Sequence, residues 1–182
     1  KCQKTTLVFM GHLLPKQGVD MVIRKIPEIV GKIPNFRFKI IGGGKYQDAL
    51  IRLANDLGVF KYCDFTGKIK DNEDLEREIA KSAVAIAPYK KSKDNYTYYA
   101  DSGKVKTYLA CGVPLLLTNV PWNAKQIEKN KCGLIIKDNG SDLVGKLLYL
   151  ISPSTNRKFR KSAIKYSASF DYERIFINIE NV

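Results

Sequence analysis

The sequence predicts an α/β protein built on a doubly wound parallel sheet of about six strands. Short, continuously apolar segments rich in β-branched residues alternate strictly with segments whose apolar residues recur at helical spacing. None of the apolar segments alternates with polar residues as a half-exposed strand would. With 182 residues, the chain is long enough for one domain with a sizeable core.

The expected strands are short runs that end at residues which interrupt regular structure. The first ends at Gly11, the second at the run Gly42 to Gly44, and the fourth at Pro88. Strands are therefore expected at residues 5–10, 36–41, 62–65 and 83–87, in a segment that ends at Thr118, and at 133–136.

The expected helices are marked by apolar spacing and by capping residues. The first carries apolar residues at helical spacing from Val19 to Ile33, and Pro34 ends it. A short helix is expected at 121–129, and two terminal helices are expected within about 155–182, separated near residue 170. The expected capping residues are Gly58 at a C-terminus and Asp71 or Asn72, Ser102 and Ser141 at N-termini.

Glycines and lysines gather in the loops that follow these strands. In a doubly wound sheet those loops share one rim, which is where ligands bind. The loop from Gly11 to Gly18 can bring backbone amides and Lys16 to a phosphate, although a plain turn explains the glycines equally well. His12 in this loop is either a structural residue or part of the site.

Two further loops on this rim permit close approach to a ligand. The run Gly42-Gly43-Gly44 lacks the full dinucleotide-binding spacing, so a nicotinamide or flavin cofactor is not expected. Its glycines still admit a bulky group, either a sugar ring or the facing half of a larger enzyme. Gly67 and Ile69 frame a loop suited to the flat edge of a base, with a simple turn as the alternative.

The segment from Asp101 to Thr107 gives the sharpest signal. Ser102 can cap a helix, Gly103 can admit a phosphate to its first-turn amides, and Lys104 or Lys106 can neutralise the charge. The alternative is an ordinary capped helix whose lysines face solvent. The long polar loop that precedes this segment, residues 89–101, favours an anion site.

Composition restricts the class of partner. The formal net charge of +13 predicts an anionic partner, such as a nucleotide or an acidic membrane surface. Nucleic acid is not expected, because the lysines are dispersed and do not interleave with aromatic residues. The four cysteines include no C-x-x-C pair and no metal-ligand cluster is present, so we expect a cytoplasmic protein without a metal site.

The order of six motifs resembles the C-terminal half of glycosyltransferase family 4. They are Gly-x-Leu-x-Pro-x-x-Gly from Gly11, Ile40-Ile41-Gly42-x-Gly44, Phe65-x-Gly67-x-Ile69, Ala87-Pro88, Ala110-Cys111-Gly112-Val113-Pro114 and Cys132-Gly133-Leu134-Ile135-Ile136. The resemblance covers essentially the whole chain. It implies a GT-B architecture in which this Rossmann-like domain, residues 1–182, binds a nucleotide-sugar donor without a metal or other cofactor. An N-terminal domain that binds the acceptor would precede it.

The chain departs from that family at the residues that hold the donor. The resemblance implies an arginine after the first glycine and a lysine before the second, yet His12 and Gln17 stand there. The family also carries two glutamates, and the aligned positions are Tyr99 and Thr107. Either the site has decayed, or Asp101, Ser102, Lys104 and Lys106 compensate. We favour compensation, because new lysines accompany the lost cations.

These observations predict the donor-binding domain of a retaining glycosyltransferase that uses a nucleoside diphosphate sugar and a glycan or lipid-linked acceptor. Lys16, Lys104 or Lys106 would stabilise the leaving diphosphate. The chain is expected to be inactive without the N-terminal domain, and its charge is compatible with an anionic inner membrane face. The alternatives are a non-catalytic basic module that binds nucleotide or RNA, and half of a sugar-nucleotide epimerase.

Overall fold

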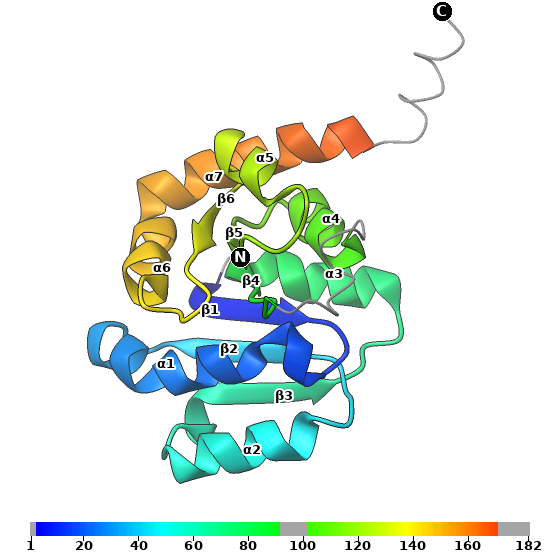
Figure 1. The fold of residues 1–182 in the computed structure, drawn as a ribbon. Helices are drawn as coiled ribbons and strands as arrows, with labels where there is room; N and C mark the ends of the chain where they lie inside the picture. Colours follow the sequence, from blue (N-terminus) through cyan, green and yellow to red (C-terminus); the bar gives the residue numbers. More distant parts are fainter. Residues whose placement is uncertain (1–2, 92–101, 171–182) are drawn as a thin grey trace, which may run out of the picture.

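The computed structural model describes residues 3–91 and 102–170. Its centre is a six-stranded sheet in the order β3-β2-β1-β4-β5-β6, and every neighbouring pair is parallel (Figure 1). The strands are β1 (Gln3–Met10), β2 (Arg37–Ile41), β3 (Cys63–Gly67), β4 (Ser82–Ala87), β5 (Leu115–Thr118) and β6 (Gly133–Ile136). The predicted fold class and number of strands are confirmed.

Helices cover both faces of the sheet. They are α1 (Val19–Lys32), α2 (Gln47–Asp56), α3 (Asn72–Lys81), α4 (Gly103–Ala110), α5 (Ala124–Lys129), α6 (Leu143–Ile151) and α7 (Pro153–Ser167). Leu7 and Phe9 of β1 pack with α1, α2 and α6, whereas Val8 packs with α3, α4 and α5. Successive side chains of one strand thus supply two cores, as the continuously apolar strands predict.

The helix ends confirm one predicted cap and correct another. The carboxylate of Asp71 accepts a 2.9 Å hydrogen bond from the Asp74 amide at the start of α3, as expected. Ser141 was expected to cap α6, but Asp142 is the N-cap residue. Ser141 lies in the preceding turn, where its amide donates to the side chain of Asn139.

The C-terminal part of the described chain is helical, and α7 begins two residues earlier than expected, at Pro153. Proline suits the first turn of a helix because the amide it lacks would have no partner there. The second terminal helix predicted beyond residue 170 lies outside the described residues. Among the helices of residues 3–91 and 102–170, none combines the length and apolarity needed to cross a membrane.

The strand order indicates which edge of the sheet can bind a ligand. From β1 the chain proceeds through β2 and β3 on one side, and from β4 through β5 and β6 on the other. The loops after β1 and β4 therefore diverge, which leaves a crevice at the carboxyl ends of these adjacent strands.

Candidate functional site

The loops after β1, β2 and β3 are held together by backbone contacts. The Gly11 amide donates to the Ile41 carbonyl at 2.9 Å, and the Gly42 amide donates to the Gly67 carbonyl at 2.8 Å. A Cβ at Gly42 would lie 2.0 Å from the Gly11 oxygen, and one at Gly44 would lie 2.4 Å from the Leu13 oxygen. At these two positions glycine therefore makes room for the backbone of the loop after β1 and not for a ligand.

Between these loops lies a groove of about 290 Å³. Five residues predicted from the sequence line it: Gly11, His12, Gly42, Gly43 and Ile69. Gly67 does not line the groove, and its carbonyl accepts the hydrogen bond from the Gly42 amide. Lys68 adds a cation to the lining, while Ile41 and Leu75 add apolar surface. The groove therefore offers backbone, an imidazole, an ammonium and apolar side chains together.

Lys104 joins this rim from the opposite half of the sheet. Its Nζ donates a 2.5 Å hydrogen bond to Oε1 of Gln17, which lies in the loop after β1. The same Nζ lies 4.3 Å from the ring centroid of Phe9 and 4.8 Å from that of Tyr89. A Cβ at Gly11 would stand 2.9 Å from it. Helix α4 thus delivers an ammonium to the crevice between β1 and β4.

The environment of this ammonium is largely apolar. Burial lowers the pKa of Lys104 from 10.5 to about 7, because the charged form loses its hydration. The contacts described for Nζ are one amide oxygen and two aromatic faces, without a carboxylate. An anion entering beside Lys104 would supply the missing counter-charge and favour the protonated form.

Ser102 precedes α4 at its N-cap position but does not cap the helix through its side chain. Its hydroxyl instead shares a 2.7 Å hydrogen bond with the Tyr89 hydroxyl. The carbonyl of Tyr89 in turn accepts a bond from Thr118 at 2.7 Å, so these residues tie the loop after β4 to β5. The expected side-chain cap is therefore wrong. The Val105 amide in the first turn of α4 donates to the Ser102 carbonyl at 3.0 Å, so the amides of the exposed Gly103 and of Lys104 are the candidates to bind an anion there.

Other predicted residues are placed differently. Lys106 follows Lys104 by two positions and so projects from another side of α4. The Thr107 hydroxyl donates to the Gly103 carbonyl at 3.1 Å, within the helix. Lys16 lies in the turn Pro15–Gln17, and its carbonyl accepts a 2.9 Å bond from the Lys90 amide. Tyr99 and Asp101 lie outside the described residues.

Sequence reasoning missed two aromatic residues that contact Lys104 and a third, Tyr108, on the same face of α4. Phe9 resembles an ordinary core residue in the sequence and Tyr89 begins the polar loop 89–101, yet the rings of both flank the ammonium. Tyr108 is fully buried, and its hydroxyl accepts a 2.6 Å bond from the Met10 amide. Tyr108 lies one helical turn after Lys104, so the two share a face of α4. That spacing is the one signal in the sequence that links them.

Comparisons with known proteins identify the family and the fold. A family model described as glycosyl transferases group 1 matches residues 4–153. This chain belongs to that family. A GDP-mannose-dependent alpha-(1-6)-phosphatidylinositol monomannoside mannosyltransferase from Mycolicibacterium smegmatis is 29% identical over 144 residues, which cover 78% of this chain and 37% of the relative.

Solved structures of glycosyltransferases share the fold. A mutant of S. aureus TarM in complex with fondaparinux, alpha-GlcNAc-glycerol and UDP superposes with a TM-score of 0.83 at 16% identity, covering 100% of this chain and 36% of TarM. The C-terminal domain of a group 1 glycosyl transferase, LpcC from Francisella tularensis, has a TM-score of 0.75 at 15% identity over 94% of this chain and 87% of that domain. This chain thus has the Rossmann-like fold of one half of a GT-B glycosyltransferase.

Proposed function

We propose that this chain is the C-terminal, donor-binding domain of a retaining glycosyltransferase. It would bind a nucleoside diphosphate sugar at the carboxyl ends of β1 and β4. One observation carries the proposal: the Lys104 ammonium is held by Gln17, the residue that stands where the family resemblance implies a lysine. The Lys104 ammonium therefore lies beside position 17, although position 17 itself carries no cation.

The diphosphate would lie between the first turn of α4 and the loop after β1. The first-turn amides of α4 and the Lys104 ammonium would bind its oxygens. When the bond between the sugar and the diphosphate breaks, negative charge grows on the leaving oxygen, and a preorganised ammonium in an apolar setting stabilises it. These groups would supply the positive charge without a metal ion. The groove lined by His12 and Ile69 would take the rest of the donor.

The acceptor would bind outside the described chain. The chain spans 37% of the length of the M. smegmatis mannosyltransferase, so a second domain would complete the cleft and the 182-residue chain would be inactive alone. The name of that relative specifies a phosphatidylinositol monomannoside as its acceptor. A glycan or lipid-linked acceptor is accordingly the class we propose here. The family match favours this function over half of an epimerase.

Calorimetry with UDP, GDP and a short RNA tests the donor site. We expect one nucleoside diphosphate to bind, and Lys104→Met to weaken that binding at least tenfold. Lys106→Met is the matched control, since it removes an ammonium from the same helix on another side. Equal affinity of the Lys104→Met variant, or binding of RNA with a steep salt dependence and no preference for a nucleotide, would contradict the proposal.

A double variant tests whether Lys104 replaces the lysine missing at position 17. Gln17→Lys alone is expected to lower stability, because it places two ammonium groups together in an apolar site. Combined with Lys104→Met, the same substitution supplies the cation from the loop after β1. The double variant is therefore expected to bind more tightly than Lys104→Met alone. Failure to recover any affinity would mean that Lys104 does not act as a substitute cation.

A further inference from the structure

Helix α7 covers the edge of the sheet opposite the candidate donor site. The Arg160 guanidinium donates to the Gly112 carbonyl and to the Ala80 carbonyl at 3.2 Å each, and also to the Ser82 carbonyl. The Asn156 side chain donates to the Ala83 carbonyl at 2.8 Å. These carbonyls lie just before or at the start of β4 and before β5. Helix α7 is therefore fixed at the amino ends of the strands, where it reaches from α6 to α4 (Figure 1).

Positive charge is concentrated at this edge. The stretch 143–170 contains six basic residues and no acidic one. Residues 79–170 as a whole contain 16 basic and five acidic residues, against 14 and ten in residues 1–78. The positive charge is therefore unevenly distributed along the sequence. Within residues 3–91 and 102–170, Arg157, Lys161 and Lys165 on one side of α7 form no ion pair.

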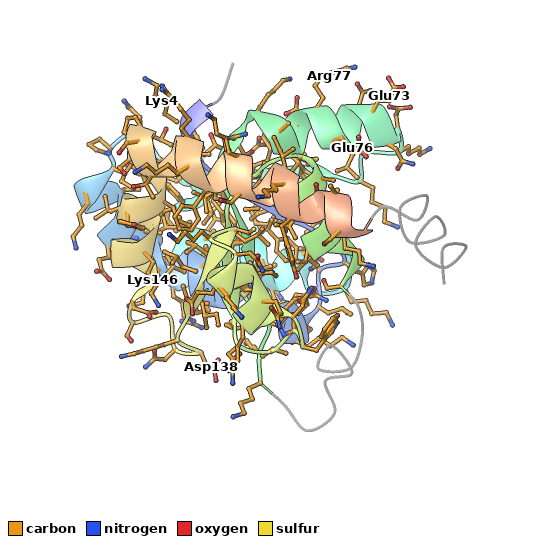
Figure 2. The ribbon with its side chains drawn as sticks, turned by 90° about the horizontal axis from the view of Figure 1, so that it is seen from above. Lys4, Glu73, Glu76, Arg77, Asp138 and Lys146 are labelled. Carbon is orange, nitrogen blue, oxygen red and sulfur yellow. The ribbon has the colours of Figure 1, made fainter. Side chains whose placement is uncertain are left out.

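An apolar groove of about 330 Å³ runs beside this basic stripe. Its apolar lining comes from Ala83, Ile151, Pro153 and Ile164, and its basic lining includes Lys4, Arg157 and Lys161. Figure 2 shows Lys4 beside the first half of α7. Ile164 is 57% exposed although it lies among lysines on a helix, so apolar surface is presented to solvent between positive charges.

We propose that this face of α7 docks on an anionic lipid surface. Arg157, Lys161 and Lys165 would contact acidic headgroups, while Ile164 and the groove would take apolar lipid chain. The combination of basic and apolar surface is what favours lipid, because a nucleic acid would use the charges but leave the groove exposed. The docking face is separate from the donor site and does not depend on the function proposed for it. Since the two lie at opposite edges, both can be occupied together.

Vesicle sedimentation of the 182-residue chain tests this proposal. At low ionic strength the chain is expected to sediment with equimolar phosphatidylcholine and phosphatidylglycerol vesicles, but not with phosphatidylcholine alone. The triple variant Arg157→Gln, Lys161→Gln, Lys165→Gln is expected to partition roughly 100-fold more weakly. The single variant Ile164→Ser keeps the net charge and is expected to lose about fivefold.

A matched control separates a specific face from net charge. The variant Arg24→Gln, Lys32→Gln, Arg52→Gln removes three exposed charges from α1 and α2 and is expected to retain most of the binding. Equal losses in both triple variants would overturn the proposal. So would an unchanged Ile164→Ser variant, or displacement of the chain from vesicles by millimolar inorganic phosphate or glycerol phosphate, which would indicate a site for soluble anions.

The donor site is monitored in the same proteins. Nucleoside diphosphate binding is expected to be unchanged in the triple variant of α7, and Lys104→Met is expected to sediment with anionic vesicles like the parent chain. If the parent chain binds nucleotide but does not bind anionic vesicles, the lipid proposal alone is rejected. The reverse result would reject the donor proposal alone.

Discussion

At the scale of single residues, the candidate site depends on an ammonium contributed across the sheet. Gln17 and Lys104 are 87 residues apart in sequence, yet their side chains form one hydrogen bond. The family resemblance implies a lysine at position 17, where an amide now accepts that bond. A lysine in both places would bring like charges together in an apolar pocket. Glutamine at position 17 and lysine at position 104 therefore fit together, because the amide at position 17 avoids the repulsion that a second ammonium would cause.

Donor binding is expected to depend on the protonation of Lys104. The pKa of this amine is about 7 in the free protein, and a bound diphosphate would raise it, since it favours the charged form. Affinity should therefore be nearly constant below pH 7 and fall as pH rises above it, by roughly 20-fold between pH 6.5 and 8.5. Calorimetry with a nucleotide sugar, whose diphosphate does not titrate in this range, measures the profile.

Two variants control this pH profile. The weaker residual binding of Lys104→Met should show little dependence on pH above 7. His12→Gln should keep the profile of the parent chain there, although His12 lines the adjacent groove. Proton uptake on binding, measured in buffers of different ionisation enthalpy, should be present in the parent and absent in Lys104→Met. An affinity that rises with pH above 7 would show that Lys104 does not bind the anion.

At the scale of elements, close backbone contacts set the position of the loop after β1. Gly18 joins the turn Pro15–Gln17 to α1 with a φ of +71°, and a Cβ there would stand 1.8 Å from the Pro88 carbonyl oxygen. This contact packs the loop after β1 against the loop after β4. It thereby helps to keep Gln17 beside the Lys104 ammonium.

Gly18→Ala is expected to lower the free energy of unfolding by about 3 kcal/mol, because it adds a backbone clash to left-handed strain. Gly58→Ala is the matched control: its φ is +66°, but no atom lies within 4 Å of the added Cβ. That variant should lose about 1 kcal/mol. Urea denaturation measures both changes. Similar losses at the two positions would mean that the contact with Pro88 contributes nothing.

Helix α7 depends on one side chain more than on the rest of its basic residues. Arg160→Met is expected to lower the free energy of unfolding by about 3 kcal/mol, since it leaves three carbonyl oxygens without their charged donor. Lys158→Met at an exposed position of the same helix should change it by less than about 0.5 kcal/mol. Thermal or urea unfolding distinguishes them. If Arg160→Met lowers the free energy of unfolding as little as Lys158→Met does, these hydrogen bonds do not hold α7 in place.

At the scale of the whole molecule, the two edges of the sheet differ in character. The carboxyl edge carries glycine loops and the partly buried Lys104 ammonium, whereas the amino edge carries the exposed basic face of α7. The chain also spans only a fraction of the length of the M. smegmatis relative. The donor site proposed above would thus lie in one domain of a larger enzyme.

The chain by itself is therefore expected to bind a nucleotide sugar but not to transfer the sugar. Incubation with the donor and a lipid acceptor should release no nucleoside diphosphate above the rate of the Lys104→Met variant. The full-length protein should release it, and its Lys104→Met variant should do so at least tenfold more slowly. Transfer by the 182-residue chain would contradict the need for a second domain.

The sequence by itself determined the alternation of strands and helices, the parallel sheet and the rim on which the glycine loops gather. These follow from local patterns, since continuously apolar strands joined by helices leave few other arrangements. The Asp71 cap followed for the same reason, because a cap depends on residues three apart. Ser141 failed because Asp142 could take the same position, and the sequence does not separate such neighbours.

Only the tertiary structure decided which side chains meet. The bond between Lys104 and Gln17, the rings of Phe9 and Tyr89 around the ammonium, and the Tyr108 hydroxyl on β1 all depend on β1 lying beside β4. The basic face of α7 likewise depends on where Arg160 fixes the helix. Local patterns specify each element, but contacts between distant residues depend on the order in which the elements pack, which no single segment encodes.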